Sequence, residues 1–145
     1  GNNYLEKLLM DIKGVSKSFP NMTKRRLEMT RFGWDQLTQD TGVDTVDIQH
    51  RMTDWGLDAY WMAHPPPIVP EPFTPEAGET PPVEDLEYWA AVLEHIASEA
   101  YSNPEVVKTA PHRQAVHRVD FAALQDPARR AMTWRAHLKK RNPEG

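Results

Sequence analysis

The stretch Pro82–Tyr101, PVEDLEYWAAVLEHIASEAY, decides the fold. Its apolar residues recur at helical spacing and form a stripe along one face, made of Leu86, Trp89, Leu93, Ile96 and Ala100. Its first turn is acidic, which the helix dipole favours, and Thr80 with Pro81 is predicted to begin it. The pattern predicts a long helix over 82–101 that ends at Asn103-Pro104.

Two shorter helices are expected before it. Apolar residues over 3–13 fall at helical spacing, and Gly14 supplies a stop. Residues 46–55 form the second, in which Thr45 is predicted to cap the helix and Gly56 to end it. On this helix Asp47 lies in the first turn, and one face carries Ile48, Met52 and Trp55.

The strand signals are weaker. Residues 26–34 alternate in side-chain type and predict a strand, and short strands are expected at Tyr60–Met62, Phe73–Thr74 and Ala115–Val119. The segment 58–82 holds eight prolines, so regular structure cannot fill it, and a long rigid loop of this kind is often functional. The order of elements predicts an α+β fold, with helices on one face of a short antiparallel sheet. Because the core is thin for 145 residues, we expect the domain to bury a face against something larger.

Composition excludes several classes of protein. There is no cysteine, which excludes disulfides and thiolate chemistry and fits a reducing compartment, so we expect a cytoplasmic protein. No apolar run is long enough for a transmembrane helix or a signal peptide. The six histidines lack the spacing of a metal site on a helix face. The net charge of −4 and the lack of a binding motif argue against nucleic acid.

Charge is unevenly distributed along the chain. Residues 71–99 hold eight acidic side chains and no lysine or arginine, whereas 127–145 hold six basic side chains and one acid. A final amphipathic helix is expected over 127–140, with Met132, Trp134 and Leu138 as its apolar residues. Two interpretations stay open. In the first, the tail and the acidic stretch are two solvated faces or pack on each other. In the second, the tail is a basic arm that binds a separate partner.

Few residues are candidates for chemistry. His64 lies inside the proline segment and His112 in a loop, while Glu76 and Glu79 lie three apart in another loop. Such a carboxylate pair suits acid–base work, although composition alone favours a solvent-facing or helix-capping role. None of the seven lysines lies in the setting expected of a Schiff-base lysine. From its residues alone the chain is an α+β module without a self-contained active site.

Several stretches, in order, resemble the C-terminal end of glycine decarboxylase P-proteins, particularly the second subunit of the split form. They are Asn3-Tyr4-Leu5, Thr45-Val46-Asp47-Ile48, Arg51-Met52-Thr53-Asp54-Trp55-Gly56, Ile68-Val69-Pro70-Glu71, Glu76-Ala77-Gly78-Glu79-Thr80, Asn103-Pro104-Glu105 and Lys108-Thr109-Ala110-Pro111-His112. Single pieces are weak, but their order and nearly constant spacing are specific. The match covers about residues 2 to 120.

The resemblance implies the small C-terminal domain (1–120) of a fold-type I enzyme that depends on pyridoxal phosphate (PLP), followed by a basic helical tail (121–145). It also implies that the Schiff-base lysine is absent here and that a partner chain carrying the large domain holds the PLP. We therefore expect a hetero-oligomer, with a lipoyl carrier protein as a further possible partner. The residues expected to line the substrate side are His64, Glu76, Glu79, Thr80 and His112.

The chain departs from the family at two histidines. One family strand reads Arg26-Leu27-Glu28-Met29-Thr30-Arg31 here, and a later motif reads Gly56-Leu57-Asp58-Ala59-Tyr60-Trp61, both without histidine. These departures put glycine as the substrate, and the carrier protein, in doubt. The alternative to an enzyme subunit is a non-catalytic interaction or regulatory module derived from the same domain.

Overall fold

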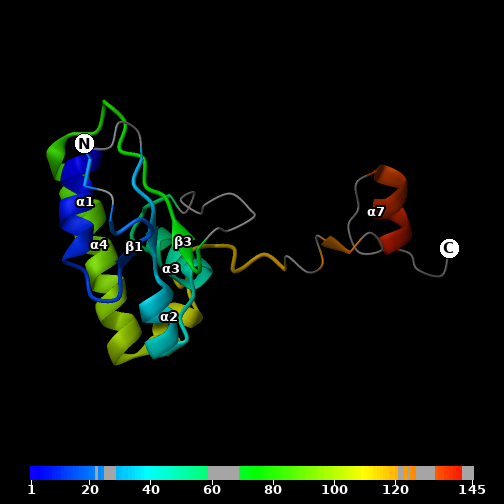
Figure 1. Cartoon of the computed structure of the whole chain (residues 1–145). Coiled ribbons are helices and arrows are strands. Elements are labelled where there is room, and N and C mark those ends of the chain that lie inside the picture. The colour runs from blue at the N-terminus through cyan, green and yellow to red at the C-terminus, as the bar shows by residue number, and fades with distance from the viewer. Residues whose placement is uncertain are drawn as a thin grey trace.

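The computed structural model describes residues 1–21, 23–24, 29–58, 69–120, 123, 125–126 and 133–141. Within these ranges the protein has helices and a small sheet (Figure 1). The helices are α1 (Asn2–Met10), α2 (Asp35–Thr41), α3 (Thr45–Thr53), α4 (Val83–Ser102), α5 (Pro104–Lys108) and α7 (Trp134–Arg141). The strands are β1 (Ser16–Lys17), β2 (Phe32–Gly33) and β3 (Pro72–Phe73).

The sheet joins three segments that are far apart in the sequence. Its strands run antiparallel in the order β1-β2-β3, with Lys17 opposite Phe32 and Phe32 opposite Phe73. The α+β class predicted from the sequence is therefore confirmed. The strand predicted over 26–34 pairs only at its end, at 32–33, because 29–31 are irregular and 25–28 lie outside the described residues.

Helix α4 lies at the centre of the packing, in contact with α1, α2, α3 and α5. All five residues of the apolar stripe predicted from the sequence are buried, namely Leu86, Trp89, Leu93, Ile96 and Ala100. Phe73 of β3 stacks on Trp34 and on Phe32, with ring centroids 5.0 and 5.3 Å apart. Because each buried large apolar side chain contributes roughly 2 kcal/mol, this shared core holds the short strands in place.

The predicted helix ends are correct to within a few residues, but two predicted caps are wrong. Asp44, not Thr45, caps α3, and it exchanges hydrogen bonds with Asp47 in a capping box. Pro82, not Thr80, is the residue that precedes α4, and no side chain caps that helix. Gly56 has a φ of 74°, which fits its predicted role in ending α3.

Two helices were missed and one predicted strand is wrong. Neither α2 nor α5 shows a periodic apolar pattern, since only Leu37 is buried in α2 and only Val107 in α5. The strand predicted at 115–119 is absent, because residues 112–116 form a series of bends and the whole of 112–120 is exposed. The short strand predicted at 60–62 lies outside the described residues.

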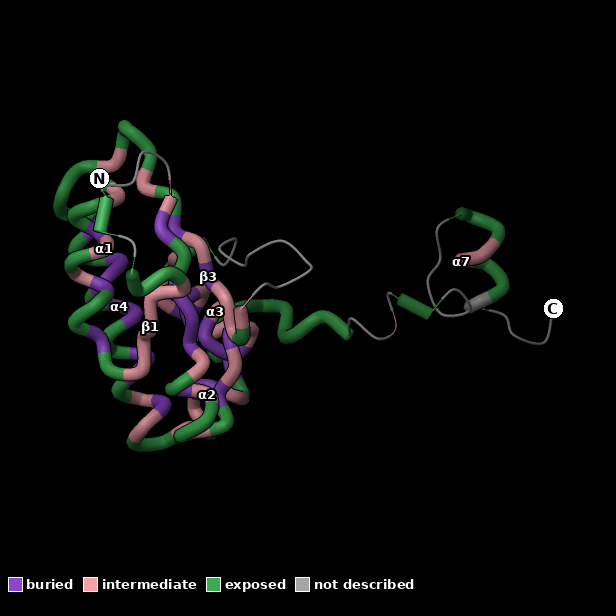
Figure 2. Tube along the Cα trace, viewed as in Figure 1, coloured by how far each residue is buried: buried purple, intermediate pink, exposed green. Residues whose placement is uncertain are grey.

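The chain beyond Pro111 differs from what precedes it. We call residues 112–120 together with α7 the C-terminal arm, and the described residues up to 111 the body. Every residue of 112–120 is exposed, and Figure 2 shows this as a green tube that leaves the body. Helix α7 corresponds to the predicted final helix, whose residues 127–132 lie outside the described ranges, and no described residue of α7 belongs to the core.

Candidate functional site

A buried carboxylate lies where α3 meets the start of the C-terminal arm. The side chain of Asp54 is only 1% exposed. Its oxygens accept hydrogen bonds from the backbone N–H of His112 at 2.7 and 2.9 Å and from that of Arg113 at 2.7 Å. Arg51 donates a further bond at 3.0 Å. Burial opposes ionisation, but these donors together lower the pKa of Asp54, so the carboxylate is charged at neutral pH.

Arg51 connects this carboxylate to α4. Its Nε and Nη2 donate to the two oxygens of Glu99 at 2.9 and 2.7 Å, a bidentate pair. The hydrogen bonds from Arg51 lower the pKa of Glu99, and those to Glu99 raise the pKa of Arg51. His95 lies 3.2 Å from the same carboxylate. Both acids are ionised acceptors, so neither carboxyl group has a proton to give at neutral pH, and their role is to anchor the backbone.

Two guanidinium groups lie close to the ring of Trp55. The Cζ atoms of Arg51 and Arg113 lie 5.9 and 5.8 Å from the ring centroid of Trp55. The ring of His95 packs edge-on against it, with the ring centroids 5.0 Å apart. The carbonyl oxygen of Trp55 accepts a bond of 2.9 Å from the hydroxyl of Tyr88. These contacts fix the point at which the proline-rich segment leaves α3.

A point within that segment, Glu71, is anchored on α3. Glu71 adopts a φ of 47°, in the left-handed region that non-glycine residues rarely occupy. Its carboxylate accepts from the backbone N–H and the hydroxyl of Thr45 at 2.8 and 2.9 Å, and its carbonyl accepts from the N–H of Trp34 at 2.9 Å. These bonds offset the cost of the strained backbone. Helix α3 therefore anchors the proline-rich segment at Glu71, which follows residues 59–68.

The predicted site residues lie in three places. His64 falls outside the described residues. Glu76, Glu79 and Thr80 are exposed on the loop between β3 and α4, which is held where the N–H of Ala77 donates to Asn2 at 2.8 Å.

His112 is exposed at the start of the C-terminal arm, with its Nε2 2.8 Å from the carbonyl oxygen of Val106. Among the described residues, no hydrogen bond or ion pair joins it to 76–80. The role of all these residues in lining a substrate site stays a prediction.

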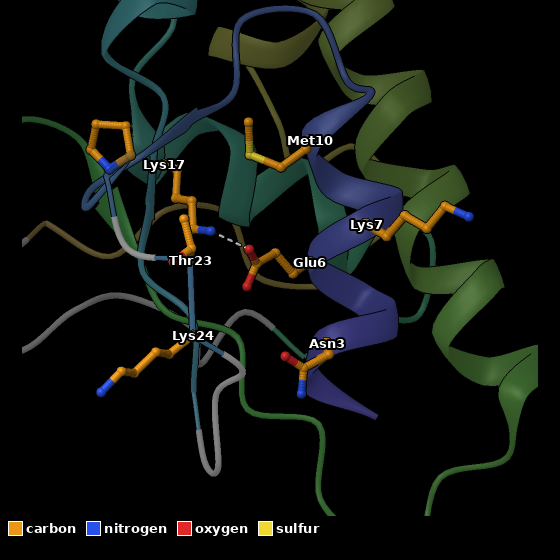
Figure 3. A pocket seen from close by; sticks show the side chains of 8 residues that line it. Asn3, Glu6, Lys7, Met10, Lys17, Thr23 and Lys24 are labelled. Atoms are coloured by element: carbon orange, nitrogen blue, oxygen red, sulfur yellow. Dashed lines mark hydrogen bonds and ion pairs between the residues drawn. The ribbon is translucent and has the colours of Figure 1, made fainter.

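An open hollow lies elsewhere, between α1 and the segment that follows β1 (Figure 3). Its volume is about 450 Å³. It is lined by Asn3, Glu6, Lys7, Met10, Lys17, Pro20, Thr23 and Lys24. Glu6 forms an ion pair with Lys17 and accepts a bond of 3.1 Å from Thr30, while Lys7 and Lys24 point away from that pair. None of the residues predicted for the site lines it.

The part of the chain that the structure describes contains no metal-binding group and no buried lysine. No cluster of three or more His, Cys, Asp or Glu side chains converges there, and its buried polar residues are Thr30, Thr45, Asp47 and Asp54. Likewise, no helix in these ranges combines the length and apolar character that a membrane crossing requires.

The reading of the sequence missed the cluster around Asp54. A signal was present, because Arg51 to Gly56 is one of the stretches that carries the family resemblance. Its partners in the C-terminal arm are backbone N–H groups 58 and 59 residues away, however, and backbone donors leave no trace in residue type.

Comparison with known proteins identifies relatives for nearly the whole chain. It is 37% identical over 138 residues to a probable glycine dehydrogenase (decarboxylating) subunit 2 of Thermococcus gammatolerans, a match that covers 94% of the chain and 26% of the relative. The Pyrococcus furiosus protein of the same description is 37% identical over 136 residues, covering 93% of the chain and 26% of that protein. The Thermotoga maritima one is 40% identical over 91 residues, covering 59% and 18%.

These matches confirm the resemblance stated from the sequence, over a stretch about a quarter as long as the relatives themselves. No protein-family model matches the chain. No solved structure matches it significantly.

Proposed function

We propose that this chain is the C-terminal small domain, 1–120, of a PLP-dependent enzyme of the glycine decarboxylase type, with a basic helical tail over 121–145. In this proposal it completes an active site whose cofactor and Schiff-base lysine belong to another polypeptide, and the two form a cytoplasmic hetero-oligomer. The observation that carries the proposal is 37% identity over 94% of the chain to proteins of which it spans only 26%.

The chemistry of the described residues supports a cofactor held elsewhere. A Schiff-base lysine needs a sheltered amine whose pKa is lowered, and no lysine in the described part of the chain is buried. Lys13, for example, lies over the ring of Tyr101 with its amine 3.7 Å from the ring centroid. PLP supplies the electron sink when it is bound, so the small domain has only to position groups around an amino-acid substrate.

Two described segments are proposed to face the partner's pocket. The side chains of Glu76, Glu79 and Thr80 project from a loop whose backbone is fixed on α1, and His112 projects from a backbone fixed on Asp54. Fixed backbones that present exposed polar side chains suit the positioning of a substrate across an interface. His64 is proposed to join them from the proline-rich segment.

Mapping the lysine that carries the cofactor tests this proposal. The complex isolated from its own host is treated with borohydride, which fixes PLP to its lysine, and the labelled peptide is sequenced. We expect the label on a polypeptide other than this chain. A label on any of the seven lysines of this chain would contradict the proposal.

The site residues have a separate test. Alanine at His64, Glu76 and Glu79 together is expected to lower the turnover of the assembled enzyme at least about tenfold, because positioning groups act on the transition state. If turnover is unchanged, the loop is structural and these residues do not belong to the site. Gln125→Ala, at an exposed position outside the loop and its contacts, is the matched control.

A further inference from the structure

The first part of the C-terminal arm is exposed but has a fixed direction. Arg118 folds back to the body, where its guanidinium donates to Asp47 at 2.6 Å and to the carbonyl oxygens of Ala110 and Val107 at 2.7 and 3.3 Å. The side chain of Gln114 donates to the carbonyl of Thr53 at 2.7 Å. With the bonds from His112 and Arg113 to Asp54, these contacts tie the arm to α3 at several points along its first nine residues.

This fixed segment presents apolar side chains to solvent. Val116 is 74% exposed and Val119 is 51% exposed, on either side of the tethered Arg118. On α7, Trp134 is 70% exposed and Leu138 is 42% exposed, and their spacing of four places them on one helix face. Isolated apolar residues are normal on a surface, but four of them on one short arm, including a tryptophan, are typical of an interface.

Three basic side chains of α7 form no ion pair with the acidic stretch 71–99. Arg135, Lys139 and Arg141 are exposed, and the ion pairs among the described residues include none between α7 and that stretch. The face of α7 is therefore apolar and bordered by positive charge.

The arm is shared with the relatives. A match that covers 96% of the 145 residues omits about six of them, so it extends through 112–120 and into α7. The relatives thus keep a segment that adds no residue to the core of the body. They also contain about three quarters of their length outside the matched part.

We propose that the C-terminal arm is the docking element of this chain, and that it binds the polypeptide corresponding to the remaining three quarters of a subunit 2-like protein. Val116 and Val119 bury against an apolar surface of that polypeptide. Trp134 and Leu138 bury beside them, and carboxylates on the partner face the basic residues of α7. This inference rests on the proposed function, which supplies the partner.

The test measures the complex between this chain and the PLP-bearing polypeptide, purified from the native host and identified by its borohydride label. Val119→Asp and Trp134→Ala are compared with Val83→Asp. The control suits the comparison because Val83 is 54% exposed, close to the value for Val119, yet it lies in the body at the start of α4. The thermal unfolding of each variant is also measured without the partner. We expect shifts of Tm below about 2 °C, because none of the three side chains is in the core.

The expected result is that each arm variant raises the Kd of the complex at least about tenfold while Val83→Asp changes it less than about twofold. The inference is overturned if the wild-type complex forms and both arm variants bind within about twofold of it, which leaves the proposed function standing. If the wild-type chain forms no complex with a PLP-bearing polypeptide, the proposed function fails and the inference fails with it.

Discussion

The body and the C-terminal arm are ordered by different physical means. In the body, apolar side chains such as Leu93 and Ile96 are fully buried around α4, and the backbone follows from that burial. In the first part of the arm every residue of 112–120 is exposed, and its course follows from hydrogen bonds to two carboxylates, Asp54 and Asp47. Burial stabilises the whole fold, whereas the tethers stabilise one local geometry.

That difference bears on function. A segment that is fixed without being buried keeps its own side chains available for another molecule. Helix α3 carries Asp47 and is directly followed by Asp54, and its Thr45 also anchors Glu71 of the proline-rich segment. It is the element on which the proposed site and the proposed docking surface both depend.

The largest expected effect is in the core of the body. Leu93→Ala is expected to reduce the free energy of unfolding by about 3 kcal/mol, because it removes a side chain that is 1% exposed and leaves a cavity. Val116→Ala in the arm is the matched change, expected to cost less than about 0.5 kcal/mol. Urea unfolding followed by circular dichroism measures both. Equal losses would mean that the arm belongs to the cooperative unit.

The junction of body and arm is expected to be nearly as sensitive. Asp54→Asn should lower the free energy of unfolding by about 2 kcal/mol. It removes the charge of a buried carboxylate that accepts hydrogen bonds from three residues. Hydrogen exchange at the amides of His112 and Arg113 should quicken in this variant. Asp58→Asn, at an exposed position, is the control and should change neither measurement. Unchanged exchange in Asp54→Asn would show that the carboxylate does not hold the arm.

Acid should weaken this junction before it weakens the apolar core. The folded-state pKa of Asp54 and that of Glu99 lie below the unfolded values, which are about 4. The unfolded state therefore takes up these protons first as the pH falls, so their stabilisation is present above about pH 4 and lost below it. Unfolding free energies at about pH 6 and about pH 3 should differ less in Asp54→Asn than in the wild type. An identical pH dependence would contradict the assigned pKa shift.

A glycine in the body tests how tightly its turns pack. Gly14 has a φ of 87°, and a Cβ there would lie 2.7 Å from the Cβ of Leu37. Gly14→Ala is expected to cost about 2 kcal/mol. Gly78→Ala, where nothing lies within 4 Å of the added carbon, should cost less than about 0.5 kcal/mol. A tolerated Gly14→Ala would show that the turn after α1 is looser than its contacts indicate.

The smallest effect on stability is expected for the second tether. The side chain of Arg118 is 34% exposed, so Arg118→Ala should cost less than about 1 kcal/mol. Its effect on the arm should be larger, seen as greater mobility of the backbone of 116–119 in NMR relaxation measurements. Arg118→Lys keeps the charge but not the fork of donors, and should restore only part of the backbone order. A loss of stability as large as that of Leu93→Ala would erase the distinction between tether and core.

The sequence predicted the elements that depend on local pattern. The stripe of α4 and the face formed by Ile48 and Met52 on α3 are confirmed because buried helix faces repeat at a fixed spacing. The strand predicted over 26–34 was too long. The segments with which a strand pairs, here 16–17 and 72–73, cannot be identified from the local sequence. The strand predicted over 115–119 was wrong, because the β-forming side chains of this segment are exposed to solvent and pack on no sheet.

The candidate site was less predictable than the fold. The histidines and the pair Glu76 and Glu79 stand out by residue type, but their exposure depends on the packing of segments distant in sequence. Asp54 does the most to hold the arm, yet nothing in its own neighbourhood predicts burial of its carboxylate. Only the three-dimensional contact with His112 and Arg113 identifies it.

Native mass spectrometry of the protein purified from its own host, combined with its visible absorption spectrum, tests the central claim most directly. We predict a complex heavier than the 16.6 kDa chain that shows the absorption band of PLP bound to a lysine. A single colourless species of 16.6 kDa would contradict the claim and leave the chain as a non-catalytic module.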